Sequence, residues 1–393
     1  METYLLDWLN LLVRWLHLIT GIAWIGSSFY FVWLDNHLLP PIKENEALQG
    51  EVWSVHGGGF YQAQKYKVAP PVMPSPLHWF KWEAYSTWMS GIFLLALVYW
   101  YGAEIYLVDI TRADLSKTQA VLSGAGGLIA GWIVYDLLCR SALAKNDRLL
   151  SAAVTLLIIV AAYGFCQIFS GRGAFIHFGA MIGTIMVANV FFVIIPGQKL
   201  MVESALKGEP SDPTPGLKAK QRSVHNTYLT LPVLFVMISN HYAFTYSGEY
   251  NWVTLLAIVV LGALIRVYFV SRHKSGNTAS KIPLLLAAGV LAALIYSGRP
   301  AVLLPVTSSQ AVTLSEVQMV IDTHCTVCHS ATPSQPGFTA APLGVVFDTQ
   351  ADINRQAQQI YQQAVVSKVM PIGNLTGMTE AERTKLGAWF LAR

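Results

Sequence analysis

Long apolar stretches recur through the first three quarters of the chain, separated by polar segments. A hydrocarbon core about 30 Å thick is crossed by roughly 20 apolar residues in a helix. Stretches that approach or exceed this length lie at 9–34, 83–101, 119–138, 149–169, 174–196, 227–247, 252–270 and 281–298. The pattern therefore predicts a mainly α fold, a polytopic membrane bundle of about eight spans.

The pattern changes after Arg299. A short apolar linker, PAVLLPVTSSQA, leads into residues 310–393, which are polar, rich in Gln and Thr and of ordinary globular character. We therefore predict two domains, a membrane domain over 1–300 and a soluble domain over 310–393. The N-terminal sequence METYLLDWLNLLVRW lacks the basic region and cleavage site of a signal peptide, so its apolar stretch is interpreted as a true span.

Composition supports a membrane protein. Hydrophobic residues make up 54% and charged residues only 12%, half the usual share in globular domains. The 12 Trp and 17 Tyr fit the aromatic belts at bilayer interfaces, so the bilayer is a predicted partner. A net charge of +4 without a basic run argues against nucleic acid. Four cysteines are too few for a disulfide framework, and Cys139 and Cys166 are interpreted as inert buried thiols.

Lys and Arg are distributed unevenly between the predicted loops. The loops after the first, third, fifth and seventh spans hold fifteen: Lys43, Lys65, Lys67, Lys81, Arg140, Lys145, Arg148, Lys199, Lys207, Lys218, Lys220, Arg222, Arg272, Lys274 and Lys281. The other side holds four: Arg112, Lys117, Arg172 and Arg299. The positive-inside rule places the first group in the cytoplasm. Both termini are then predicted to be periplasmic, in a multi-pass protein of a bacterial inner membrane.

The soluble domain carries a C-x-x-C-H motif at Cys325, Cys328 and His329. A redox dithiol or half of a zinc site would be the alternatives. The segment has no other cysteine and no visible βαβ pattern, which disfavours both. The motif predicts a covalent c-type haem (heme c), with two thioethers from the thiols and His329 on the iron. Such a haem is expected outside the cytoplasm, where the charge count independently places this domain.

A low-spin cytochrome needs a sixth ligand, and two methionines are candidates. Met370 lies in VMPIGN, which resembles the distal loop of small class I cytochromes c. Met378 immediately precedes Thr379, the predicted N-cap of a C-terminal helix in which Glu382 completes a capping box. That position leaves Met378 little freedom to reach iron. Met370 is therefore the favoured ligand of a class I-like cytochrome c domain.

Three histidines fall at similar depth in the predicted spans, roughly 6–14 Å below the outer surface at 1.5 Å per residue. They are His17, His177 and His241, and Arg14 lies one helical turn from His17. Ionisable groups inside a membrane are costly and usually functional. These histidines could ligate a b-type haem (heme b) or line a substrate site in the outer half of the bundle. The alternative is that each only hydrogen-bonds a neighbouring helix.

The first loop is long and aromatic, and it contains the segment EVWSVHGGGFYQAQKY. Long loops in compact proteins are usually functional or disordered, and the aromatic content disfavours disorder. His56 and the three glycines after it could offer open backbone N–H groups to a planar polar ligand. They match no phosphate-binding loop. A packing or re-entrant loop is the alternative.

Three segments, VRWLHLITGIAWIGSSFYFVWLD, GEVWSVHGGGFYQAQKY and LHWFKWEAYSTWMSG, occur together with the C-terminal C-x-x-C-H and MPIGNLTGMTEAER. In this combination the whole chain resembles the bacterial membrane-bound, cytochrome c-linked urate oxidase (urate hydroxylase) family. The resemblance implies an eight-span domain fused to a cytochrome c. It also implies oxidation of urate with water to 5-hydroxyisourate, without peroxide. Electrons would leave through the cytochrome to a downstream respiratory acceptor.

The residues that would act on urate are not fixed by the resemblance. Arg14, His17 and His56 are the catalytic candidates, and two locations stay open: the outer cluster around His17 and the loop around His56. Two other functions also stay open. One is a quinol–cytochrome c electron-transfer module without purine chemistry, and the other is a transporter or metal-handling protein with a redox accessory.

Overall fold

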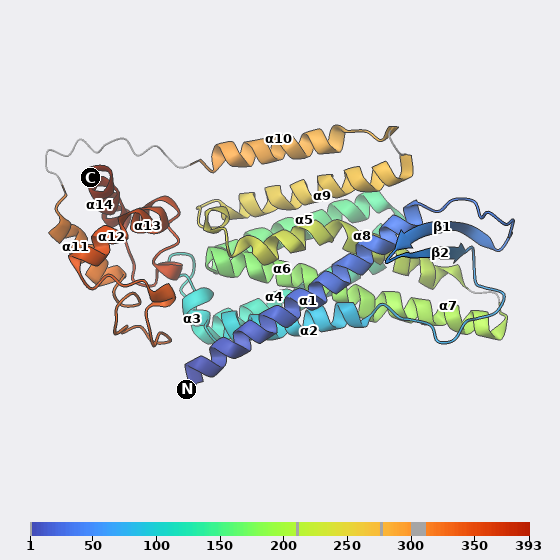
Figure 1. The fold of residues 1–393 in the computed structure, drawn as a ribbon, viewed down its shortest axis with the longest axis horizontal. Coiled ribbons are helices and arrows are strands. Elements are labelled where there is room, and N and C mark those ends of the chain that lie inside the picture. Colours follow the sequence, from blue (N-terminus) through green and yellow to red (C-terminus); the bar gives the residue numbers. More distant parts are fainter. Residues whose placement is uncertain (1, 210–211, 276–277, 300–311) are drawn as a thin grey trace.

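The computed structural model describes residues 2–209, 212–275, 278–299 and 312–393. A long bundle of helices carries a smaller helical domain, the tail, against one end (Figure 1). The prediction of a mainly α fold is confirmed. The predicted domain boundary between 300 and 310 falls outside the described residues.

The bundle consists of helices and one hairpin. In chain order its elements are α1 Glu2–Asn36, β1 Leu48–His56, β2 Gly59–Tyr66, α2 Trp82–Leu95, η1 Ala96–Trp100, α3 Ala103–Tyr106, α4 Lys117–Arg140, η2 Ala142–Lys145, α5 Asp147–Ile168, α6 Gly171–Asn189, η3 Val190–Ile194, α7 Ile195–Lys207, α8 Pro213–Ser239, η4 Ala243–Thr245, α9 Asn251–Ser275 and α10 Ile282–Ser297. Of the η elements, η1 and η3 are π-helical and continue the preceding α-helices.

The tail has its own set of short helices. They are α11 Leu314–His324, η6 Pro342–Gly344, α12 Gln350–Arg355, α13 Ala357–Ile360, η7 Tyr361–Val366, η8 Ile372–Asn374 and α14 Glu380–Leu391. The capping box predicted for the last helix is confirmed: Thr379 accepts from the backbone N–H of Glu382, and the Glu382 carboxylate accepts from Thr379. Residues including Val317, Ile321, Ile353 and Leu386 form a separate hydrophobic core here.

Each predicted span overlaps a helix, but not every helix is long and apolar enough to cross a membrane. Among the described residues, five segments are long and apolar enough to cross a membrane: Tyr4–Asn36, Lys117–Arg140, Asp147–Ile168, Gly171–Lys207 and Asn251–Arg272. The α2 helix continues as a π-helical segment, the α8 helix begins with polar residues, and α10 is shorter. Eight as the number of spans therefore stays a prediction.

The sixth span was predicted at 227–247, and its boundaries differ from the structure. Asp212 caps α8 through its side chain and Pro213 occupies the first turn, so the helix begins fourteen residues earlier than hydropathy indicates. The helix ends at Ser239. His241 therefore lies beyond the helix, exposed in the following turn, while Arg222 is buried within α8 instead of lying in a loop.

The long first loop forms an antiparallel hairpin that the hydropathy pattern did not predict. Its strands pair from Leu48 opposite Tyr66 to His56 opposite Gly59. The two turn residues, Gly57 and Gly58, have φ of 56° and 81°. Positive φ at both central residues is the requirement of a type I′ turn, which explains the glycine run without a ligand.

Figure 1 shows the hairpin and α7 at the end of the bundle opposite the tail, whereas the start of α1 lies at the tail's end. The two ends of the described chain thus share one end of the bundle, as the predicted orientation requires. The side of a membrane that this end faces stays a prediction.

The tail rests on the bundle at α3. A Cβ added at Gly373 would lie 3.0 Å from the carbonyl oxygen of Val108, and one at Gly337 would lie 3.2 Å from Ile105 Cδ1. Gly373 has a φ of +58°, a conformation that glycine adopts without strain. This close contact brings the C-x-x-C-H region of the tail against the bundle.

Candidate functional site

The C-x-x-C-H motif lines a cavity of about 420 Å³ in the tail. The α11 helix ends at His324, and a turn follows in which the N–H of His329 donates to Cys325 O at 2.8 Å. Both thiols are free and partly accessible. The local fold thus brings Cys325, Cys328 and His329 to one cavity wall.

A hydrogen bond to the backbone sets the orientation of the His329 ring. Its Nδ1 lies 3.0 Å from the carbonyl oxygen of Val345, to which it can only donate. This contact fixes the tautomer and leaves the Nε2 lone pair available, the arrangement found in metal-ligating histidines. Free thiols, a preoriented imidazole and a cavity fit a covalent c-type haem.

The two candidate methionines have different surroundings. Met370 lines the same cavity as Cys325 and His329. Met378 is 3% exposed and packs in the hydrophobic core of the tail. Arg383 holds the Met370 segment, because its guanidinium donates to the carbonyl oxygens of Met370, at 2.8 Å, and Ala364. Of the two methionines, Met370 is therefore the one that lines the cavity of the C-x-x-C-H motif.

Three residues of the bundle complete the wall of this cavity: Ile105, Tyr106 and Arg172. Arg172 follows Ser170, which caps α6 and donates to the carbonyl oxygen of Tyr106 at 2.8 Å. The Arg172 guanidinium lies 5.1 Å from the Tyr106 ring and donates from Nε to the Tyr99 hydroxyl at 3.0 Å. A cation from the bundle thus closes one side of this cavity.

A second cavity, of about 310 Å³, lies inside the bundle between α1, α2, α6 and α8. Arg14, His17 and His241 all line it, so the structure brings together two of the three predicted histidines. Nδ1 of His17 lies 3.0 Å from Thr87 O and 3.2 Å from the Ser90 hydroxyl. Arg14 bonds Asn10 at 3.1 Å. This cavity is the candidate site for a b-type haem.

His177 does not line either cavity. It is fully buried, its Nδ1 lies 2.8 Å from Gly173 O, and its Nε2 accepts from Trp100 Nε1 at 3.1 Å. A Cβ on Gly124 would lie 2.7 Å from Nε2 of His177. Both ring nitrogens are therefore engaged in a tightly packed helix contact. These surroundings are the ones expected of a histidine that only hydrogen-bonds its neighbours and binds no cofactor.

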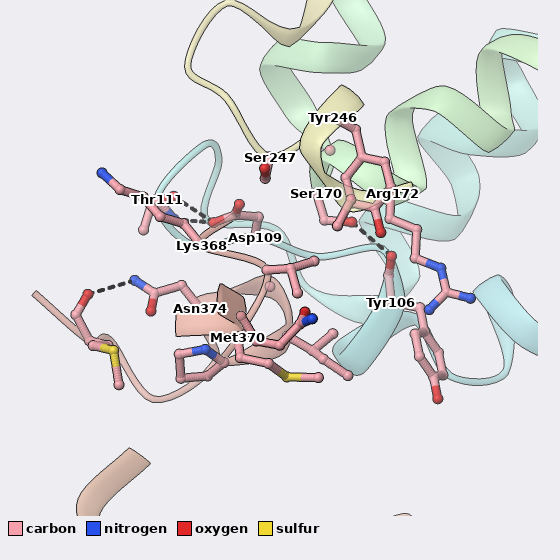
Figure 2. Close-up of a pocket in the computed structure, with 18 of the residues that line it drawn as sticks. Tyr106, Asp109, Thr111, Ser170, Arg172, Tyr246, Ser247, Lys368, Met370 and Asn374 are labelled. Atoms are coloured by element: carbon pink, nitrogen blue, oxygen red, sulfur yellow. Dashed lines mark hydrogen bonds between the residues drawn. The ribbon is translucent and has the colours of Figure 1, made fainter. Parts of the chain in front are cut away.

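A third cavity, of about 600 Å³, lies between the bundle and the tail. Figure 2 shows Tyr106, Ser170, Arg172 and Tyr246 of the bundle facing Met370 and the rest of the tail loop. Asn240 and His241 line this cavity as well as the one inside the bundle. The sequence pattern did not predict the interdomain cavity, because it forms only when the two domains dock.

A fourth cavity, of about 630 Å³, lies between α1, the 68–80 segment, η3, α7 and α8, and includes His78 and Asp35 but no Lys or Arg among its lining. His56 lines none of the four cavities and is exposed at the tip of the hairpin. Its catalytic role stays a prediction. Within the part of the chain that the structure describes, no three His, Cys, Asp or Glu side chains gather as a site for a bare metal ion.

The sequence analysis also missed a buried polar network on α4, α6 and α8. Arg222 donates to Asp136 at 2.7 Å and to Asn189 at 3.2 Å. Asn189 in turn donates to the Tyr135 hydroxyl at 3.1 Å, and Tyr135 bonds Nδ1 of His225 at 2.7 Å. A buried ionic network within apolar helices is expensive, so it indicates a structural or functional role.

Comparison with protein families gives one match. A family described as "Urate oxidase N-terminal" matches residues 3–297, which is the whole bundle. Neither a curated protein nor a solved structure matches the chain.

Proposed function

The chain belongs to the urate oxidase N-terminal family, and from this premise we propose that it oxidises urate and passes the electrons to a c-type haem in its own tail. The family match, which covers 3–297, is the observation that carries the urate assignment. The cavity around Cys325, His329 and Met370 supports the cytochrome as the internal acceptor.

The proposed reaction converts urate and water to 5-hydroxyisourate. A new C–O bond forms at C5 of the purine, an O–H bond of water breaks and releases one proton, and two electrons leave the urate monoanion. No oxygen is reduced, so no hydrogen peroxide forms. The c-type haem supplies a one-electron acceptor when bound, and a downstream respiratory acceptor of one-electron type must reoxidise it twice in each turnover.

The residues of the tail hold and orient that acceptor. Cys325 and Cys328 would form the thioethers, while His329 and Met370 would bind the iron. Val345 fixes the His329 tautomer, and Arg383 fixes the Met370 segment. The bundle contributes Arg172 and Tyr106 to the same cavity, which joins the two domains around the acceptor.

A b-type haem between His17 and His241 is a further part of the proposal. Both residues line the cavity inside the bundle, and His17 keeps Nε2 available because its hydrogen bonds use Nδ1. We also propose that the protein lies in a bacterial inner membrane with the tail in the periplasm, which the distribution of Lys and Arg supports.

A quinol–cytochrome c module is the second candidate function. The fourth cavity, at the hairpin end of the bundle, favours this function. Aromatic residues such as Trp24 and Phe31 line this cavity and no Lys or Arg does, which suits the neutral ring of a quinol.

One anaerobic experiment separates the two functions. Purified holoprotein in detergent is mixed with urate, xanthine or a quinol while the absorption bands of the c-type haem are followed. We expect urate to reduce the haem and xanthine to leave it oxidised. Reduction by quinol alone would reject the urate assignment and leave the electron-transfer module. A pyridine haemochrome assay on the same sample identifies the haem types.

A further inference from the structure

The four cavities differ in what they offer to a planar purine anion. Such a ligand is held by a cation that can form charge-assisted hydrogen bonds, by an aromatic surface and by acceptors for its N–H groups. The cavity at the hairpin end has no Lys or Arg in its lining. In the cavity inside the bundle, the only cationic side chain among the lining residues is Arg14, which already bonds Asn10 through Nε and Nη2.

The interdomain cavity contains an arginine with free donors. Lys368 pairs with Glu380 at 2.8 Å, and Arg383 donates to backbone carbonyls. Arg172 makes one hydrogen bond, from Nε to the Tyr99 hydroxyl, and forms no ion pair with any residue that the structure describes. Its two terminal nitrogens are therefore available for a bidentate contact with an anion.

The other requirements are met around Arg172. The rings of Tyr106 and Tyr246 line the same cavity. The Oδ1 atom of Asn240, also on the cavity wall, is buried without a hydrogen-bond partner among the described residues. A buried acceptor without a donor is costly, and an N–H of a purine would satisfy it. Arg172 also lies at the N-terminal end of α6, where the helix dipole favours negative charge.

This cavity also adjoins the haem pocket. Tyr106, Arg172 and Met370 line both. A molecule in the interdomain cavity therefore lies beside the loop that carries the sixth ligand. No carrier would be needed across the bilayer, in contrast to a substrate site at the hairpin end.

We propose that the interdomain cavity is the urate site, with Arg172 binding the anion and Asn240 accepting from a purine N–H. This inference rests on the proposed function and adds its location. Urate there loses two electrons, one at a time, to the adjacent haem, and water forms the bond to C5. Asp109, on the same wall, accepts the proton from water, since its hydrogen bonds with Thr111 use Oδ1 and leave Oδ2 available among the described residues.

The test measures binding without turnover. Holoprotein reduced with dithionite cannot accept electrons, so the dissociation constant of radiolabelled urate is determined by equilibrium dialysis under argon. We expect Arg172→Gln to weaken binding by about tenfold or more, the loss of a charge-assisted contact, and Arg172→Lys to restore part of it. Arg148→Gln, which removes an exposed cation at the start of α5, should match the wild type.

A second variant guards against indirect damage. Asn240→Leu removes the orphan acceptor with little change in volume, and it should weaken urate binding while the haem spectrum stays that of the wild type. Wild-type affinity in both Arg172→Gln and Asn240→Leu would overturn the inference, as would a tenfold loss confined to Arg14→Gln. If urate reduces the wild-type haem in that case, the proposed function stands and only the location fails. Absence of both reduction and binding in the wild type rejects the function itself.

Discussion

Arg222 on α8 and Asp136 on α4 form an ion pair at 2.7 Å in which 4% of the arginine side chain and 14% of the aspartate side chain are exposed. Asp136 also binds Arg140, one turn along its own helix, at 2.6 Å, but Arg140 is 66% exposed. One carboxylate thus holds a buried cation and a solvated cation.

The buried half of this arrangement should dominate stability. Asp136→Asn leaves the Arg222 cation without its counter-ion, and breaking a buried pair costs about 3–5 kcal/mol. Arg140→Gln breaks only a surface pair, which is worth about 0.5 kcal/mol or less. Thermal unfolding in detergent, followed by tryptophan fluorescence, compares the two. Equal shifts in the midpoint would contradict the structural interpretation.

Met370 and Met378 are distinguishable by spectroscopy. Met370→Ala should abolish the far-red absorption band that methionine ligation gives ferric haem c, and should lower the reduction potential, because the thioether ligand is lost. Met378→Leu conserves volume in the core and should cost less than about 1.5 kcal/mol, with the band retained. The reverse pattern would make Met378 the ligand.

Glu382 should make the tail sensitive to acid. Hydrogen bonds from the Thr379 side chain, from its backbone and from His324 lower the pKa of Glu382 from 4.5 to about 2. Because the folded pKa is the lower one, this stabilisation is complete above pH 4.5 and is lost as the pH falls towards 2.

Glu382→Gln should therefore lower the stability of the tail at neutral pH and flatten its acid unfolding curve, as followed by circular dichroism of the holoprotein. Glu316→Gln is the matched control, since Glu316 completes the capping box of Thr313 without a histidine partner. An identical response of the two variants would show that the hydrogen bond from His324 does not contribute to the acid sensitivity of the tail.

The histidines of the bundle should differ in their effect on a b-type haem. His17→Ala is expected to lose the protohaem signal in a pyridine haemochrome assay, because it removes the Nε2 that the hydrogen bonds of His17 leave available. His177→Gln should keep it, since both nitrogens of His177 are committed to Gly173 and Trp100. Loss in His177→Gln alone would reverse this assignment, and absence of protohaem from the wild type would remove it.

His56 at the hairpin tip provides the test of the loop as a substrate site. The glycines beside it satisfy a type I′ turn, and its side chain lines no described cavity, so His56→Ala should change urate turnover by no more than about twofold. A loss above tenfold would restore the hairpin as part of the active site. Trp53→Phe on the same strand controls for damage to the hairpin.

Local patterns were sufficient for much of the fold. Apolar stretches located the helices, and Thr379 with Glu382 predicted a cap that the structure confirms. The hairpin was missed although Gly57 and Gly58 between β-forming residues are its signature, because a hydropathy window does not register period-two alternation. The end of α8 was misplaced because hydropathy does not register the caps that define helix ends.

Relationships across long separations could not be predicted in this way. Charge counting assigned Arg222 to a loop, since its partner Asp136 lies 86 positions away and only the packed bundle joins them. The surroundings of His177 likewise depend on tertiary contacts. So does the position of Arg172, which lines both the interdomain cavity and the cavity of the C-x-x-C-H motif. The candidate haem-binding residues Cys325, Cys328 and His329 could be recognised in the sequence because they form one contiguous motif, whereas Met370 joins their cavity only through the fold.

The contact at Gly373 has a kinetic consequence. Because a Cβ added at Gly373 would lie only 3.0 Å from the Val108 carbonyl oxygen, the tail and the bundle meet there without an intervening side chain. The two partners are parts of one chain, so their encounter needs no diffusion and its rate should not depend on protein concentration. A bulkier residue at position 373 would act as a spacer, and the series of side-chain sizes would calibrate how steeply electron transfer falls with separation.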